Sequence, residues 1–207
     1  MKGGASMTTM SKQPTVVTQA DWVLGPRQGE WTYDAYAALP DDGQRYEIID
    51  GVLLVMTPAP SPQHQRVGFR IAKRLSIYIE ATDQGEVFIA PLDVELAPKT
   101  VVQPDVFILL KANPAKITAK RIQGVPDLAV EVSSPGTVGH DRSGKQRAYE
   151  RAGVREYWFV DPLAQTIEIL VLEGKVYTSL GVFSGEQTLP SLVVPALEEV
   201  SAEKFFM

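Results

Sequence analysis

The stretch Val125-Pro126-Asp127-Leu128-Ala129-Val130-Glu131-Val132-Ser133-Ser134-Pro135 predicts a buried strand with one carboxylate, Glu131, set among apolar residues. Valine, leucine and alanine on both sides of Glu131 are typical of a strand that is covered on both faces. An isolated carboxylate in such a strand has a large desolvation cost. We therefore expect the protein to use Glu131, and the alternative is a buried glutamate that is paired with an arginine.

A second carboxylate, Asp105, stands where another strand begins, in Gln103-Pro104-Asp105-Val106-Phe107-Ile108-Leu109-Leu110. On adjacent strands, Asp105 and Glu131 would reach the same ion. Magnesium is usually held by one or two carboxylates together with water and substrate phosphates, so the pair predicts a magnesium site that activates water. The alternative for Asp105 is a turn residue, because Pro-Asp is a common turn pair.

A lysine is predicted to point inward near these acids. Lys145, Ala148, Tyr149 and Ala152 are spaced at i, i+3, i+4 and i+7, which places them on one stripe of a helix. An inward lysine can orient a nucleophilic water or neutralise a developing negative charge. The alternative is a packed stem whose ammonium group stays in solvent.

His64 and Glu47 are weaker candidates from the residues alone. His64 opens a long helix, where it can cap the helix, contact phosphate or position a ligand, although a histidine there often has no role. Glu47 stands beside Tyr46 and before Ile48-Ile49, so it either joins the acidic cluster or faces outward from its strand. We interpret His140, in a glycine-rich loop, as structural.

The composition of the 207 residues predicts one domain with an oxygen-based metal site. Hydrophobic residues make up 44% of the chain, so we expect a single domain over residues 19–207 after a flexible tail over residues 1–18. The absence of cysteine excludes disulfides, thiolate nucleophiles and cysteine zinc sites, and two histidines disfavour a histidine-rich zinc site. No stretch resembles a signal peptide or a membrane span, which favours a cytoplasmic protein without a membrane partner.

The formal net charge of -5 argues against a protein that coats nucleic acid nonspecifically. Positive charge is nevertheless concentrated in two runs. Residues 111–124 contain four cations and no acid, and residues 141–155 contain five cations and two acids. These runs form either a basic surface beside the two acidic strands or solvated faces without a partner.

Apolar periodicity and turn residues predict the remaining elements. We expect helices over residues 32–39 with Thr32 as N-cap, 64–81, 141–153 with Asp141 as N-cap, and a short one over 196–205. Strands are expected over 46–49 and 52–56, joined by Asp50-Gly51, over 86–96 with a bend near Pro91, over 156–160, and in a hairpin of 166–172 with 175–183. This order indicates an α/β sheet with helices on its faces.

A set of motifs stands in a fixed order along residues 30–185: Tyr46-Glu47-Ile48-Ile49-Asp50-Gly51, His64, Pro104-Asp105-Val106, residues 126–135, Asp141, Lys145, Tyr149, and Gly153-Val154-Arg155-Glu156-Tyr157-Trp158-Phe159-Val160-Asp161-Pro162. As an ordered set, they resemble the Uma-type family of restriction-endonuclease-like proteins. That family, long named as a domain of unknown function, belongs to the PD-(D/E)xK nuclease superfamily. The resemblance implies a restriction-endonuclease-like core, in which a central mixed β-sheet is flanked by helices and carries N-terminal and C-terminal β-hairpin additions.

The resemblance also implies roles for individual residues. The Pro-Asp of the superfamily motif matches Pro104-Asp105, and its acidic residue matches Glu131. The backbone carbonyl of Val132 would face the metal, and Glu47 and His64 would border the site.

The chain departs from the superfamily pattern at one position. Two residues after Glu131, where the lysine normally stands, the chain has Ser133. Similar families are thought to move that lysine to the next helix, where Lys145 is the matching residue.

The leading hypothesis is an endonuclease that hydrolyses DNA with magnesium or manganese, in which Asp105 and Glu131 hold the metal and Lys145 aligns the water. A second hypothesis is a catalytically degenerate nuclease fold that acts as a nucleic-acid or protein interaction module, because of Ser133 and the acidic net charge. Hydrolysis of another phosphoester is a third, since strand-borne acids do not specify the leaving group. A homodimer is expected by analogy, because two symmetric sites suit the cutting of a duplex.

Overall fold

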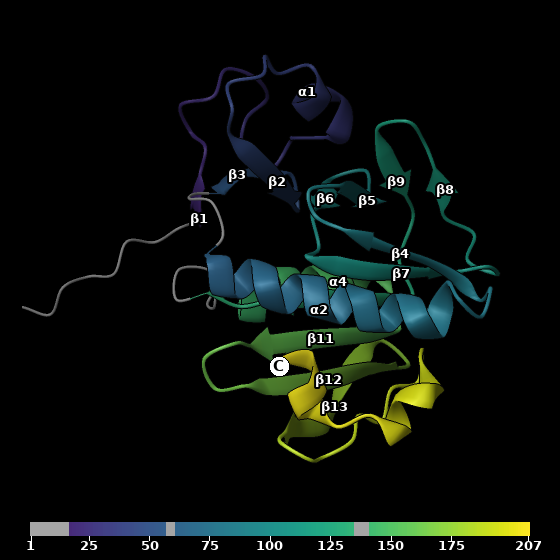
Figure 1. Cartoon of the computed structure of the whole chain (residues 1–207). Helices are drawn as coiled ribbons and strands as arrows, with labels where there is room; N and C mark the ends of the chain where they lie inside the picture. The colour runs from purple at the N-terminus through teal and green to yellow at the C-terminus, as the bar shows by residue number, and fades with distance from the viewer. Residues whose placement is uncertain (1–16, 57–60, 135–140) are drawn as a thin grey trace, which may run out of the picture.

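The structure is a computed structural model that describes residues 17–56, 61–134 and 141–207. Within these residues the chain forms two mixed β-sheets and a few helices (Figure 1). The core sheet has the order β13-β12-β11-β10-β7-β4 and consists of β4 (Gly85–Ile89), β7 (Val106–Leu110), β10 (Leu128–Val132), β11 (Glu156–Asp161), β12 (Thr166–Glu173) and β13 (Val176–Ser184). The side sheet has the order β1-β3-β2-β6-β5-β9-β8 and consists of β1 (Val17–Gln19), β2 (Arg45–Ile49), β3 (Val52–Met56), β5 (Asp93–Ala97), β6 (Thr100–Val102), β8 (Lys116–Ile117) and β9 (Arg121–Gln123).

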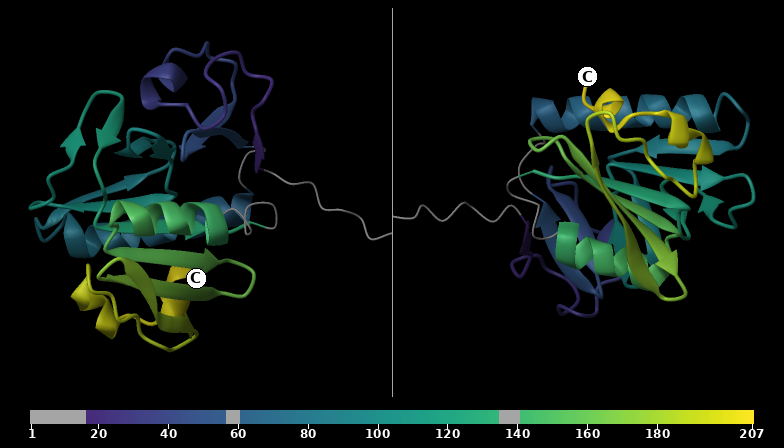
Figure 2. Two further views of the ribbon diagram at one scale, coloured as in Figure 1. Left: turned by 180° about the vertical axis from the view of Figure 1, so that it is seen from behind. Right: turned by 90° about the horizontal axis from the view of Figure 1, so that it is seen from below.

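Helices cover both faces of the core sheet. The helices on the core sheet are α2 (Pro62–Ile79) and α4 (Gln146–Ala152), whereas α1 (Tyr33–Ala37) packs with the side sheet. The chain also has a π-helical turn at Asp141–Lys145 and 3-10 turns at Pro195–Glu199 and Ala202–Phe205. Figure 1 shows α2 in front of the core sheet, and the view from behind in Figure 2 shows α4, in green, across the opposite face. None of the described helices is long and apolar enough to cross a bilayer.

The central strands of the core sheet are apolar on both faces because each face is covered. Val106 and Ile108 of β7 pack in one cluster with residues of α2, whereas Phe107 packs in a second cluster with α4 and the side sheet. Successive side chains of a strand point to opposite faces. In β10, Val130 lies on the α2 side and Ala129 on the α4 side, so Glu131 also faces α4.

The α/β class is confirmed, and the structure has two mixed sheets where one central sheet with two added hairpins was expected. The N-terminal hairpin of β2 and β3 belongs to the second mixed sheet. The C-terminal hairpin of β12 and β13 continues the core sheet, because β12 pairs with β11 in antiparallel register along the whole of β11.

The stretch from Glu86 to Leu96 is two strands in different sheets, which corrects the prediction of one bent strand. β4 ends at Ile89 and pairs with β7 in the core sheet. β5 begins at Asp93 and pairs with β6 in the side sheet. Pro91 lies in the connection, where a residue without a backbone N–H cannot continue the ladder.

Several predicted boundaries need smaller corrections. Val17–Gln19 pairs with β3, so the predicted tail over residues 1–18 extends too far, and its remaining residues lie outside the described part. The predicted helix from Asp141 ends at Gly153 as expected, with φ 92°, but Asp141 lies inside the π-helical turn rather than capping the helix. Residues 196–205 form two 3-10 turns, because Ser201 between them pairs with Thr188.

The Asp50-Gly51 hairpin is confirmed. Ile49 pairs with Val52, and the two turn residues have positive φ values of 53° and 76°. Two-residue turns of this kind match the twist of the flanking strands.

Gly51→Ala is expected to destabilise the protein more than Gly174→Ala, a matched change at the start of the β12–β13 turn. Both glycines have positive φ, 76° and 65°, where an L side chain costs about 1–2 kcal/mol. A Cβ on Gly51 would lie 2.3 Å from the carbonyl oxygen of Gly29, whereas a Cβ on Gly174 would meet nothing within 4 Å. Urea unfolding should show a loss of about 1 kcal/mol for Gly174→Ala and at least about 2 kcal/mol for Gly51→Ala. Equal losses would contradict this explanation.

Candidate functional site

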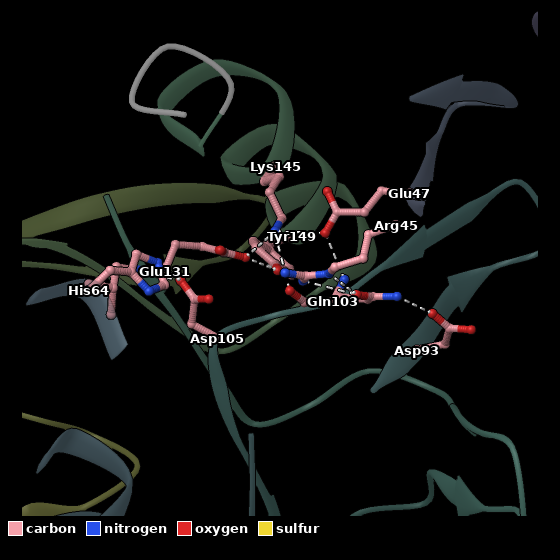
Figure 3. Close-up of polar contacts among 10 residues, drawn as sticks. Arg45, Glu47, His64, Asp93, Gln103, Asp105, Glu131, Lys145 and Tyr149 are labelled. Atoms are coloured by element: carbon pink, nitrogen blue, oxygen red, sulfur yellow. Dashed lines mark hydrogen bonds and ion pairs between the residues drawn. The ribbon is translucent and has the colours of Figure 1, made fainter. Parts of the chain in front are cut away.

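The strand register places Asp105 opposite Glu131. β7 and β10 are antiparallel, with Val106 paired to Val130 and Phe107 to Ala129. One step further along the same register, Asp105 stands across from Glu131. Directly opposed residues share a face of the sheet, with Cβ atoms about 4.5–5.5 Å apart, and Figure 3 shows the two carboxylates side by side. The sequence prediction that adjacent strands bring these acids together is confirmed.

Lys145 joins Glu131 to a third carboxylate. Its Nζ lies 2.8 Å from Glu131 Oε1 and 2.9 Å from Glu47 Oε1. Only 3% of the Lys145 side chain is exposed, so the alternative of an ammonium group in solvent is excluded. Glu47, from β2 of the side sheet, therefore belongs to the acidic cluster, and Glu131 is paired with a lysine rather than with an arginine.

Tyr149, one helical turn after Lys145, also contacts the carboxylate of Glu131. Its hydroxyl donates to Glu131 Oε1 at 2.5 Å. Burial raises the pKa of Tyr149 well above its usual value, and the charges of Glu131 and Glu47 raise it further. The phenol therefore stays protonated and acts as a donor. The sequence placed Tyr149 on the inward stripe of the helix without predicting this contact.

Asp105 is held at the more open side of the site. His64 Nε2 lies 3.1 Å from Asp105 Oδ2, with 14% and 19% of the two side chains exposed. The backbone N–H of Val132 donates to the same oxygen at 2.8 Å. Ser61 caps α2 by accepting from the backbone N–H of His64, so the positive end of the helix dipole also faces this region.

Gln103 connects the two sheets at the site, and sequence reasoning missed it. Its backbone N–H donates to Glu47 Oε1 at 2.8 Å, and Lys145 Nζ lies 3.5 Å from its carbonyl oxygen. Its side-chain oxygen accepts two bonds from Arg45, at 3.0 and 3.1 Å, and its amide nitrogen donates to Asp93 Oδ1 at 2.8 Å (Figure 3). The available signal was its position directly before Pro104-Asp105.

The donor set at Asp105 and Glu131 fits magnesium. Among the described residues, no three side chains of His, Cys, Asp or Glu form a ready metal cluster. Magnesium does not require one, because it is usually held by one or two carboxylates with water and substrate phosphates. The contacts of Asp105 with His64 and with the backbone N–H of Val132 both use Oδ2. Val132 directly follows Glu131 in the chain. His140, interpreted as structural, lies outside the described residues.

Many cations of the two basic runs are already paired. The ion pairs are Lys111 with Asp83, Arg121 with Glu95 at 2.7 Å, Arg151 with Asp50 at 2.8 Å, and Arg155 with Asp127 at 3.4 Å. This favours the interpretation of Lys111, Arg151 and Arg155 as ordinary surface residues, whereas the Arg121 side chain is only 19% exposed. Lys116, Lys120 and Arg147 are exposed.

Comparison with known proteins agrees with the motifs. Residues 33–203 match the Uma2 family, described as "Putative restriction endonuclease". The fold is similar to the crystal structure of a putative nuclease belonging to DUF820 from Anabaena variabilis ATCC 29413, with a TM-score of 0.70 and 17% identity, covering 85% of this chain and 97% of that one. No curated protein matches the chain. Because the family match covers most of the sequence, the chain belongs to the Uma2 family of restriction-endonuclease-like proteins.

Proposed function

We propose that the protein is a magnesium-dependent endonuclease that hydrolyses phosphodiester bonds of DNA. The observation that carries this proposal is the contact of a buried lysine with Glu131, which stands opposite Asp105 in the strand register. The superfamily motif has a lysine two residues after its acidic residue, but this chain has Ser133 there. The ammonium group of Lys145, from the next helix, contacts the carboxylate of Glu131 instead. Membership of the Uma2 family supports the proposal.

The carboxylates of Asp105 and Glu131, with the backbone carbonyl of Val132, would hold the magnesium or manganese ion. When bound, such an ion supplies a Lewis acid and lowers the pKa of a bound water. The site lies where β7 begins and β10 ends, and Asp105 and His64 are its more exposed members. We therefore place the substrate phosphate on their side.

The other residues of the site orient its reacting groups and balance their charges. Lys145 aligns the attacking water and neutralises negative charge that develops on the phosphate. Tyr149 fixes the carboxylate of Glu131 through a short hydrogen bond. Glu47 holds Lys145 from the opposite side, which keeps the ammonium group directed into the site.

Asp105→Ala and Glu131→Ala are each expected to lower DNA cleavage at least about 100-fold, because losing even a partner that does not touch the metal typically costs about 10–100-fold and a ligand should cost more. Cleavage of single- and double-stranded DNA with magnesium or manganese measures this effect. Asp161→Asn is the matched control. Asp161 ends the neighbouring strand β11 and accepts from backbone N–H groups of its own turn, at Leu163 and Ala164, so its change should leave cleavage unchanged.

Equal cleavage by wild type and both alanine variants would contradict the proposed mechanism. If the wild-type protein binds DNA but neither cleaves it nor binds magnesium in a titration, the result would instead favour the interaction module.

A further inference from the structure

One face of α2 points away from the core sheet and carries an exposed aromatic ring between two cations. Pro62, Arg66, Phe69, Lys73 and Ile77 follow one another at steps of three or four residues, so they form one stripe of the helix, and all five are exposed. Phe69 is 65% exposed. Figure 1 shows α2 in front of the core sheet, with no described segment drawn across this face. We call these five residues the outer stripe of α2.

The charge of the outer stripe suits an anionic partner. The helix contains no acid and four cations, which are Arg66, Arg70, Lys73 and Arg74. Arg70 and Arg74 donate to the carbonyl oxygens of Phe206 and Lys204, so these two arginines hold the C-terminal segment against the helix. In contrast, Arg66 and Lys73 form no ion pair with any carboxylate in the described part of the chain.

Two acids, Glu80 and Glu203, have to be weighed against these cations. Glu80 follows the helix, seven residues beyond Lys73, and accepts from the backbone N–H of Val87 at 3.0 Å. Glu203 belongs to the 3-10 turn that packs against α2, and it lies 3.7 Å from Lys204 Nζ. The middle of the outer stripe, from Arg66 to Lys73, therefore stays positive.

The outer stripe is continuous with the candidate site. His64, in the first turn of α2, lies 3.1 Å from Asp105. Phe69 is five residues further on, which is about 7.5 Å along the helix axis. Glu131, however, faces α4 on the other side of the core sheet. A chain that runs from the candidate site onto the outer stripe must therefore bend around the start of α2.

This bend favours a single strand of DNA over a duplex. Duplex DNA has a persistence length of about 150 base pairs, so it resists bending within a few nucleotides. A single strand is flexible, and its bases are free to stack. Proteins typically bind single strands with cations along the backbone and aromatic rings that stack on the bases. Phe69 between Arg66 and Lys73 provides both.

We propose that the outer stripe of α2 binds a single-stranded segment of DNA that leaves the candidate site. A base stacks on Phe69, and phosphates contact Arg66 and Lys73. The inference rests on the proposed function and specifies its substrate, which is DNA with a single-stranded flank beside the cleaved bond.

Fluorescence anisotropy tests this surface with a labelled oligothymidylate of about 16 nucleotides and a blunt duplex of equal length, each mixed with the full chain in EDTA. Phe69→Leu should weaken binding of the single strand at least about fivefold, because stacking of one base contributes about 1–3 kcal/mol. Duplex binding should not change, since paired bases cannot stack on the ring. Leucine is a good helix former, so this variant keeps α2 intact.

Two controls separate the ring from exposed apolar area. Phe69→Tyr keeps an aromatic ring and should bind the single strand as the wild type does. Leu163→Ala removes a side chain that is 72% exposed in the turn between β11 and β12, and it should change nothing.

Arg66→Ala and Lys73→Ala should each weaken binding of the single strand. Each should also lower the slope of log affinity against log salt by about 0.7, as for one lost phosphate contact on a single strand. Lys175→Ala, an exposed lysine in the turn between β12 and β13, should leave affinity and slope unchanged.

Wild-type affinity of Phe69→Leu for the single strand would overturn the proposal. So would equal losses of single-strand and duplex binding in Arg66→Ala and Lys73→Ala, which would indicate a surface for duplex phosphates. If neither form of DNA binds, but vesicles that contain phosphatidylserine bind and lose affinity in the same variants, the outer stripe contacts a membrane and the proposal is wrong.

These outcomes are separate from cleavage, because the binding test contains no metal. DNA cleavage that depends on Asp105, without binding that depends on Phe69, removes only the single-strand surface. Binding that depends on Phe69, in a wild type that does not cleave DNA with magnesium or manganese, removes only the proposed enzyme.

Discussion

Lys145→Met is expected to lower the free energy of unfolding by about 3–5 kcal/mol, the usual cost of removing one partner from a buried ion pair. Methionine fills much of the same volume but carries no charge. The ammonium group contacts two carboxylates, Glu131 and Glu47, whose side chains are 3% and 1% exposed. Without it, both carboxylates lose a positive partner in a place where water cannot replace it.

Urea unfolding measures this loss, and Arg147→Met, an exposed cation on the same helix, is the control and should change stability by less than about 0.5 kcal/mol. A second variant separates charge from packing. If the cost is the unbalanced charge of Glu47, then Lys145→Met combined with Glu47→Gln should recover part of the lost stability. Wild-type stability in Lys145→Met would show that the ammonium group is not needed to balance the buried acids.

The parts of the site that could be predicted from sequence are those encoded by short local patterns. Glu131 stood out because a carboxylate interrupts an apolar strand, and Lys145 because helical spacing places it with Ala148 and Tyr149. The pairing of Asp105 with Glu131 followed from the assumption that two strands with acids are neighbours, and the register confirms it. The first two steps need only one element and its period, and the third needs two neighbouring strands.

The parts that could not be predicted depend on contacts between segments that are far apart in the sequence. Gln103 bonds Glu47 across 56 positions of sequence and Arg45 across 58, and neither spacing has a local pattern. The division of Glu86–Leu96 between two sheets was missed for the same reason. Both halves are apolar enough for a strand, and only tertiary pairing decides which sheet each joins.

A third buried glutamate, Glu156, shows why an acid in an apolar strand does not by itself identify a functional site. Glu156 of β11 is 0% exposed, like a catalytic candidate, and it was not singled out from sequence. Its Oε1 accepts from Trp158 Nε1 at 2.6 Å, and its Oε2 accepts from the N–H groups of Leu192 and Val193 at 2.7 and 2.9 Å. Glu156 therefore acts as an internal cap that attaches the C-terminal segment to the core sheet.

Glu156→Ala is expected to lower the free energy of unfolding by at least about 3 kcal/mol, because three donors lose a charged acceptor and each such loss costs about 1–3 kcal/mol. The donors at Leu192 and Val193 precede the 3-10 turn Ala202–Phe205, which packs on α2 and β13. Limited proteolysis should therefore cut between β13 and residue 195 sooner than in the wild type. Urea unfolding gives the size of the loss.

Glu156→Gln and Glu173→Ala are the matched controls for this change. Glutamine keeps one acceptor oxygen, so its loss should be smaller than that of alanine. Glu173 ends β12 in solvent and bonds only the nearby Thr178 hydroxyl in the described structure, so its removal should cost less than about 0.5 kcal/mol. If Glu156→Ala cost no more than Glu173→Ala, the burial of Glu156 would need another explanation. If instead Glu131 and Glu156 both affect stability but only Glu131 affects DNA cleavage, the chemical role of Glu131 is distinguished from the structural role of Glu156.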